Sequence, residues 1–249
     1  MAKAKINTAK SPYHKAFADA FAYLTARYSR YQVWSDFVTM TACSISNSCD
    51  KRFFAEREAM YMASVKRYEK SDAEKFVEMF SIVVQALSDN PEQDFLGEIF
   101  SSLNLHNEWK GQFFTPYHVG GLMAKINSEN LAAELEEKEY ITVSDCCCGA
   151  GCLLVAYANE ARKASADFQN RIIFVAQDLD YTAALMCYIQ LSLLGCKAVV
   201  KVGDSLVSPF TPADVEKDCV WLTPMYLYGD TFRLARLMSE TLAPKHNNT

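Results

Sequence analysis

The 249-residue sequence lacks several features that would assign it to a special class of protein. It has no apolar run of the roughly 18 residues that a membrane span requires. The N-terminus carries charge, but no apolar stretch follows it, so we expect no secretory signal. No internal repeat and no low-complexity linker interrupts the chain. Half of the residues are hydrophobic and 22% are charged, which predicts one or two domains with substantial cores.

The chain also lacks an excess of basic residues. Its 25 lysines and arginines are outnumbered by 30 aspartates and glutamates, and the formal net charge is −5. A domain that binds nucleic acid unaided usually has a clear basic excess. We therefore expect any phosphate-binding surface to be local or to be supplied by a partner. Lys3, Lys5, Lys10 and Lys15 give the N-terminus a basic bias, which we interpret as a solvated tail.

Cysteine is frequent, with nine in the chain, but its spacing excludes the usual structural uses of the residue. Cys146–Cys148 cannot form a regular disulfide framework, because successive side chains of a strand point to opposite faces. These three residues and Cys152 lack the paired Cys-x-x-Cys spacing of zinc sites, and the four histidines form no metal-ligand or catalytic pattern. We predict no metal site, and reduced thiols in a cytoplasmic protein.

Two regions with different patterns follow one another along the chain. In the first, apolar and aromatic residues recur at helical spacing and predict helices near residues 13–28, 34–45, 52–70, 76–87 and 95–103. In the second, short β-rich runs at 141–144, 172–176, 198–202 and 219–222 are joined, for the first three, by helical patterns at 152–163 and 181–194. Strands that alternate with helices favour a parallel α/β sheet. The fold class is therefore α/β, with a helical domain at residues 1–110 and a Rossmann-like α/β domain at residues 111–249.

A glycine loop follows the first predicted strand and provides a candidate ligand site. Ligands bind outside the carboxyl ends of parallel strands, and Gly149 and Gly151 allow a tight turn there with close backbone approach to a ligand. The helix that begins near Cys152 presents free N–H groups to the same place. Asp178 ends the next strand and could accept hydrogen bonds from two ribose hydroxyls, with Asp180 as the second choice. This pattern alone also fits a dinucleotide dehydrogenase.

The segment Gly111–Val119, which reads GQFFTPYHV, lies roughly 30 residues before this loop and narrows the choice. Locally, we expect Thr115 to cap a helix whose first residue is Pro116. The two segments in this order resemble the S-adenosylmethionine (SAM) site of N6-adenine DNA methyltransferases, most closely the modification subunits of type I restriction–modification systems, with the gamma-type motif order. The resemblance extends over roughly residues 94–226, including Asp94–Phe100, and implies a SAM-dependent methyltransferase domain rather than a dehydrogenase. The residues that it implies for SAM are Phe114, Thr115, Pro116, Asp145, Cys147, Gly149, Gly151, Asp178 and Asp204.

The resemblance also implies where a catalytic loop would lie. In the family, Asn or Asp, two prolines and an aromatic residue follow the fourth strand and bind the amino group of a flipped adenine. The corresponding residues here are Thr223, Pro224, Met225 and Tyr226. Thr223, Pro224 and Tyr226 are therefore the candidate catalytic residues, with DNA as substrate and a separate specificity or partner subunit to select the site. Direct transfer from the sulfonium requires no cysteine nucleophile.

The same loop leaves a second function open. Thr223 stands where the family has Asn or Asp, and Met225 replaces the second proline. Only one further helix, at residues 231–242, is predicted after this loop, so the sheet is predicted to be incomplete. The alternative function is therefore a catalytically impaired SAM-binding subunit or regulator that acts through a partner.

Overall fold

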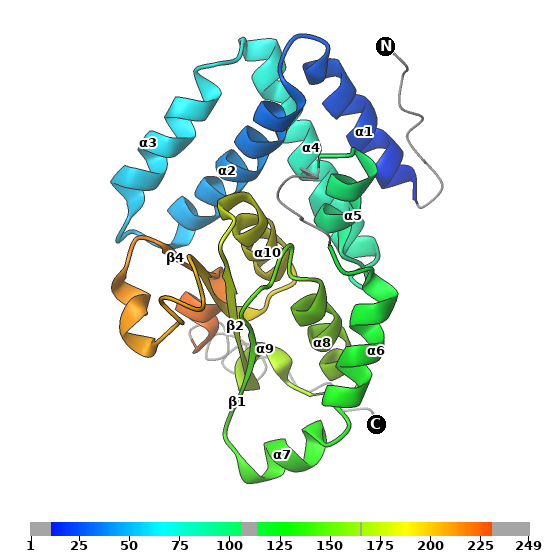
Figure 1. Cartoon of the computed structure of the whole chain (residues 1–249), viewed down its shortest axis with the longest axis vertical. Helices are drawn as coiled ribbons and strands as arrows, with labels where there is room; N and C mark the ends of the chain where they lie inside the picture. The colour runs from blue at the N-terminus through cyan, green and yellow to red at the C-terminus, as the bar shows by residue number, and fades with distance from the viewer. Residues whose placement is uncertain (1–10, 106–113, 165, 231–249) are drawn as a thin grey trace, which may run out of the picture.

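The computed structural model of the chain describes residues 11–105, 114–164 and 166–230 (Figure 1). Its first part is helical, as the apolar periodicity predicts. The helices are α1 (Pro12–Thr25), α2 (Arg30–Cys49), α3 (Phe54–Val65), α4 (Lys70–Asp89) and α5 (Phe95–Ser102). The charged stretch predicted as a helix over residues 52–70 ends at Val65, and α4 begins at Lys70. The polar first turn of α4 precedes its apolar stripe, so periodicity places the start of this helix too late.

Aromatic residues form the core of this helical region. Phe17, Trp34 and Phe37 are fully buried. Their rings meet edge to face, with centroids 5.2 Å apart for Phe17 and Phe37 and 6.0 Å apart for Phe17 and Trp34. Edge-to-face pairs add stability beyond the burial of their area. These stripes therefore form the core of the helical region.

The second part alternates helices and strands. Its elements are α6 (Tyr117–Asn127), α7 (Leu131–Glu137), β1 (Ile141–Asp145), α8 (Cys152–Lys163), α9 (Phe168–Arg171), β2 (Ile172–Asp178), α10 (Tyr181–Leu193), β3 (Lys197–Val202), the 3₁₀ helix η2 (Pro212–Glu216) and β4 (Val220–Leu222). The strands form one sheet in the order β1-β2-β3-β4, and β1, β2 and β3 are parallel. The α/β class and the parallel arrangement of the first three strands are thus confirmed.

The fourth strand corrects the expectation of a wholly parallel sheet. β4 pairs antiparallel with β3, with Leu222 opposite Val199 and Val220 opposite Lys201. Parallel pairing requires a crossover connection, usually an α-helix. Between β3 and β4 the only helical element is η2, five residues long, so the chain turns back beside β3 instead. The carboxyl end of β4 consequently lies at the amino end of β3.

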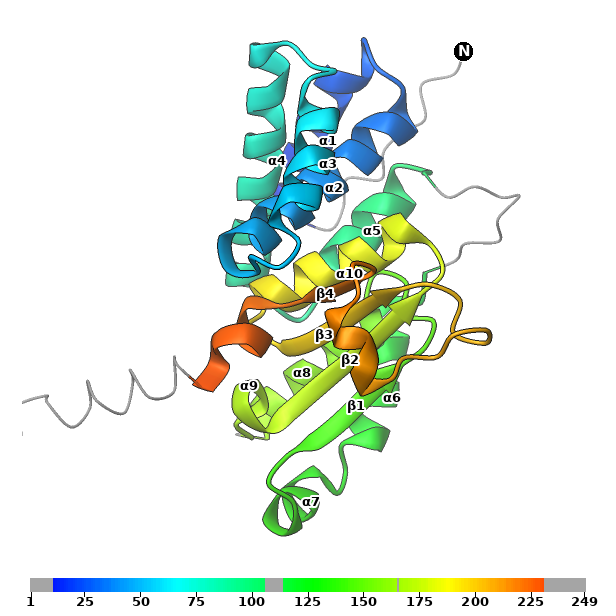
Figure 2. The same cartoon turned by 90° about the vertical axis from the view of Figure 1, so that its left-hand side faces the viewer.

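Helix α10 lies between the sheet and the helical region (Figure 2). It packs against β2 and β3 on one side and against α2 on the other, and one continuous core contains buried residues of both regions, from Phe17 of α1 to Trp221 of β4. Helix α8 covers the same face of the sheet, with α6 outside it (Figures 1 and 2). None of the described helices is long and apolar enough to cross a membrane.

Arg57 of α3 attaches β4 to the helical region. Its side chain is 2% exposed, its guanidinium lies 4.2 Å from the centre of the Trp221 ring, and it donates a 2.8 Å hydrogen bond to the carbonyl of Val220. The same guanidinium forms an ion pair with Asp50 at 3.1 Å. The position of β4 is therefore determined by contacts with the helices as well as by the sheet.

Some predictions lie outside the described residues. The proposed boundary near residue 110 falls within residues 106–113, as do the first three residues of the GQFFTPYHV segment. The lysines at positions 3, 5 and 10 and the helix predicted over residues 231–242 also lie outside the described ranges.

Candidate functional site

The turn after β1 is closed by hydrogen bonds to the end of β2. The amide of Gly149 donates to Oδ2 of Asp178 at 2.8 Å, and the amide of Cys148 donates to the carbonyl of Gln177 at 3.0 Å. Within the turn, the amide of Cys147 donates to Oδ1 of Asp145 at 3.1 Å. The carboxyl ends of two neighbouring parallel strands therefore hold the glycine loop in one conformation.

Both glycines of this loop are required by its geometry. Gly149 has φ +53° and Gly151 has φ +94°, a region of backbone conformation that residues other than glycine rarely adopt. A Cβ on Gly149 would lie 2.9 Å from the ring of Phe114, and one on Gly151 would lie 2.8 Å from Sγ of Cys187. The contact with Phe114 brings the Phe-Thr-Pro segment onto the glycine loop, although Phe114 and Gly149 are 35 positions apart in the sequence.

The start of α6 differs by one residue from the prediction. Pro116, not Thr115, is the residue that caps the helix, and the first helical residue is Tyr117; the cap makes no side-chain hydrogen bond. Pro116 has extended backbone, with φ −60° and ψ 138°, and this conformation delays the helix. The Thr115 side chain is consequently exposed and lines a cavity of about 680 Å³ between α1, α5 and α6.

The two acidic residues of the site have different environments. Burial raises the pKa of the Asp145 carboxyl, and the nearby charge of Asp178 acts in the same direction. Asp178 accepts from Gly149 with one oxygen and from the amide of Asp180 with the other, at 2.9 Å. Asp180 instead caps α10, accepting from the amide of Ala183 at 3.0 Å. Asp178 is therefore the carboxylate that meets the glycine loop.

Asp204 lies in the loop after β3, next to the end of β2. Its Oδ1 accepts from the amides of Leu206 and Val207, and the preceding amide, that of Gly203, donates to the carbonyl of Asp178 at 2.9 Å. The carboxylate thus shapes its own loop at the same end of the sheet as Asp145 and Asp178.

Gln177 holds this loop in place and was not predicted as a site residue. It is buried, donates to the carbonyls of Gly203 and Ser208, and accepts from the amide of Phe210. An amide in an otherwise apolar strand is a signal in the sequence that could have identified it. Buried Lys201 adds a 2.9 Å ion pair with Asp214 and hydrogen bonds to Ser208.

Gln190 is a second residue that the sequence did not reveal. It is fully buried in α10 and donates to Oδ1 of Asp94 at 2.7 Å and to the carbonyl of Ala150 at 2.8 Å. Its own oxygen accepts from the amide of Leu96 at 3.2 Å. Asp94 also caps α5 by accepting from the amide of Gly97. One side chain therefore connects the start of α5 to the glycine loop.

The structure does not bring the predicted catalytic residues to this group. Because β4 is antiparallel, Thr223 lies at the amino end of β3, whereas Asp145 and Asp178 lie at the carboxyl ends of their strands. The Thr223 hydroxyl is fully buried; it donates to the carbonyl of Cys196 at 2.7 Å and accepts from the amide of Ala198 at 2.9 Å. In this arrangement the hydroxyl binds backbone groups at the start of β3 and does not face the glycine loop.

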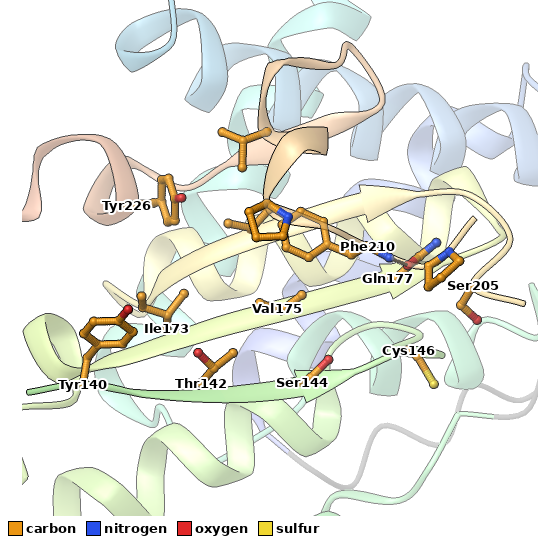
Figure 3. Close-up of a pocket in the computed structure, with 14 residues that line it drawn as sticks. Tyr140, Thr142, Ser144, Cys146, Ile173, Val175, Gln177, Ser205, Phe210 and Tyr226 are labelled. Atoms are coloured by element: carbon orange, nitrogen blue, oxygen red, sulfur yellow. Dashed lines mark hydrogen bonds between the residues drawn. The ribbon is translucent and has the colours of Figure 1, made fainter. Parts of the chain in front are cut away.

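A groove on the open face of the sheet joins the two ends (Figure 3). It encloses about 570 Å³ and has Cys146 and Ser205 at the carboxyl end of the parallel strands and Tyr140 and Tyr226 at the other end. Phe210 lies in the wall of the groove that Gln177 and Lys201 anchor. Tyr226 thus lines the same groove as Cys146, the first residue of the turn after β1, but at the far end of it.

The parallel strands β1, β2 and β3, the glycine loop and the acidic residue at the end of β2 are consistent with a methyltransferase-like α/β fold. The family model for N-6 DNA methylase matches residues 92–247, more than half of the chain, and the protein belongs to that family. The match begins just before α5, so it includes Asp94 as well as the glycine loop. No curated protein and no solved structure shows a significant match to the chain.

Proposed function

We propose that this chain binds SAM at the carboxyl ends of β1 and β2 and acts as a subunit of a DNA adenine-N6 methylation system. Membership of the N-6 DNA methylase family supports DNA methylation in general. The observation that carries the cofactor assignment is the 2.8 Å hydrogen bond between the Gly149 amide and Asp178, together with the packing of Phe114 on Gly149. These contacts unite the segments on which the resemblance to a SAM site rests.

Each acidic residue has a role suited to its surroundings. Each oxygen of Asp178 accepts one backbone amide, so a second lone pair on each can accept a ribose hydroxyl. Asp145 is a carboxyl that burial keeps from ionising easily, and a positive charge nearby reverses that effect. We assign to Asp145 the binding of the cationic amino-acid end of SAM. Thr115, which follows Phe114 in the chain, is assigned to the same end of SAM. SAM would supply the methyl group from its sulfonium.

The position of Thr223 favours the partner-dependent form of this function. Amino hydrogens of adenine need acceptors close to the methyl donor, and misplacing one such group typically costs a hundredfold or more in rate. The Thr223 hydroxyl is used by Cys196 and Ala198 at the other end of the sheet. We therefore propose that the groups that accept those hydrogens from a flipped adenine, and the groups that read the DNA site, come from a partner subunit.

The first test is calorimetric titration of the chain with SAM. Loss of charged hydrogen bonds costs about 1.5–3 kcal/mol each, so Asp178→Ala should weaken SAM binding by at least tenfold. Asp178→Asn keeps one acceptor oxygen, so its affinity for SAM should lie between those of the wild type and Asp178→Ala. The control is Asp218→Ala, because Asp218 is exposed and follows η2. Equal affinities for the wild type and Asp178→Ala would contradict the cofactor assignment.

Methyl transfer is tested separately on duplex DNA. We expect no transfer by the isolated chain and transfer when candidate specificity subunits are added. Efficient transfer by the isolated chain would contradict the partner requirement while leaving SAM binding intact.

A further inference from the structure

Two thiols beside the glycine loop, in the turn after β1, are more exposed than all the other cysteines of the chain. All nine cysteines lie within the described residues, and only Cys146 and Cys147 are exposed; Cys219 is partly buried and the other six are buried. The two exposed cysteines occupy the turn directly after β1. Because β1 ends at Asp145, Cys146 and Cys147 do not belong to the strand, and their side chains are not forced to alternate between its two faces. Both neighbours act on the pKa of the Cys147 thiol: hydrogen bonding to Cys146 raises it and hydrogen bonding to Ser205 lowers it.

A bond between these thiols would be strained. Unstrained disulfides join Cα atoms about 4.4–6.8 Å apart. Adjacent Cα atoms are only about 3.8 Å apart across a trans peptide. Strained disulfides are more easily reduced and are typical of labile, regulatory bonds rather than structural ones. The pair is therefore suited to reversible oxidation.

The strain would act on the cofactor loop. The peptide that links the two cysteines carries the Cys147 amide, which donates to Asp145. The next two amides, of Cys148 and Gly149, donate to the carbonyl of Gln177 and to Asp178. A change in the backbone at residues 146–147 therefore displaces three hydrogen-bond donors that shape the site.

We propose that Cys146 and Cys147 form a reversible thiol–disulfide site that switches off cofactor binding, with a low-molecular-weight disulfide such as oxidised glutathione as the oxidant. This proposal rests on the proposed function only in naming the cofactor that is lost. The modification itself depends on the two thiols alone.

The reaction proceeds by two exchanges. The Cys146 thiolate attacks one sulfur of oxidised glutathione, and the S–S bond of glutathione breaks. One glutathione leaves as a thiolate, and the other remains bound to Cys146 as a mixed disulfide. The Cys147 thiol then gives up its proton and attacks the Cys146 sulfur, and the second glutathione leaves. The protein dithiol is oxidised and one glutathione disulfide is reduced to two thiols. Partial desolvation and hydrogen bonding to Cys146 raise the pKa of the Cys147 thiol, so we assign the first attack to Cys146.

The experiment treats the full chain with oxidised glutathione and then with dithiothreitol. Peptide mapping by mass spectrometry should find a peptide that has lost two hydrogen atoms and contains a Cys146–Cys147 bond. Amide hydrogen exchange across residues 145–151 should become faster on oxidation and slow again on reduction. SAM affinity should fall at least tenfold and recover with dithiothreitol. Cys219→Ser should respond like the wild type, whereas oxidised and reduced samples of Cys146→Ser/Cys147→Ser should have equal affinities.

The readouts separate the two proposals. If the reduced chain does not bind SAM, the proposed function fails, and mapping and hydrogen exchange still decide the redox proposal. Reaction at Cys219 without a Cys146–Cys147 bond would overturn the redox proposal. A Cys146–Cys147 bond that leaves hydrogen exchange and SAM affinity unchanged would overturn the switch.

Discussion

Replacement of Gln190 by leucine should destabilise both the fold and the glycine loop. The Gln190 amide makes three buried hydrogen bonds, at 2.7 Å to Asp94, 2.8 Å to the Ala150 carbonyl and 3.2 Å from the Leu96 amide. A net value of about 1 kcal/mol per bond gives about 3 kcal/mol for the three. The Leu96 amide is then left buried without this partner, which adds about 1–2 kcal/mol. Leucine has a similar volume, so we expect no large cavity, and the free energy of unfolding should fall by about 4–5 kcal/mol.

Guanidinium unfolding followed by circular dichroism measures this change. Gln85→Leu is the matched control, because Gln85 lies on the exposed face of α4 and donates one hydrogen bond to Ser81. Exposed substitutions of this kind usually change stability by less than about 0.5 kcal/mol. SAM affinity should also fall in Gln190→Leu, since Ala150 belongs to the glycine loop. A loss of less than about 1 kcal/mol would refute the role assigned to these hydrogen bonds.

Three further changes test other parts of the structure. Asp145→Asn should raise the midpoint of thermal unfolding at pH 7 to 8, because burial raises the pKa of Asp145 and makes its ionised form costly in the folded state. This gain in the midpoint should vanish as the pH falls below 3.8, the ordinary pKa of an aspartate, because the carboxyl is then protonated in both states. A gain that persists below that pH would contradict the assignment. Gly151→Ala should destabilise the fold by about 1–3 kcal/mol in urea unfolding, because of its positive φ and the contact with Cys187; an unchanged midpoint would show that the loop can adopt another conformation. Arg57→Met should cost about 3–5 kcal/mol in the same assay, because Asp50 loses one buried partner and Val220 its donor; wild-type stability would exclude the role of Arg57 in holding β4.

The sequence predicts the elements of this fold better than their arrangement. Apolar periodicity reveals the helices because each buries one stripe of side chains, and α8 runs over residues 152–163 as predicted. The short α7 has too few turns to show a periodic stripe, and no prediction was made for it. The direction of β4 depends on what lies between it and β3. A strand pattern alone does not contain that information, and the connection is helical only over the five residues of η2.

The candidate site was predictable where it depends on strand ends. Asp145 and Asp178 end adjacent parallel strands, so their positions at one edge of the sheet follow from the pattern of strands and helices. The role of Gln190 was not predictable, because Asp94 and Ala150 reach it from distant parts of the chain through the packing of α5 and α10. The start of α6 was misplaced by one residue because a proline can occupy either the cap or the first turn of a helix.

The two halves of the proposed reaction have different structural supports. The proposed cofactor site depends on β1, β2 and the turn between β1 and α8, all of which are held by parallel pairing and by Gln190. The Thr223 loop depends on β4, which Arg57 binds to the helical region. Moving Thr223 to the cofactor end would require β4 to leave β3 and to lose the buried contacts of Arg57. The buried contacts oppose this rearrangement, which supports the proposal that a partner brings its own acceptor to the glycine loop.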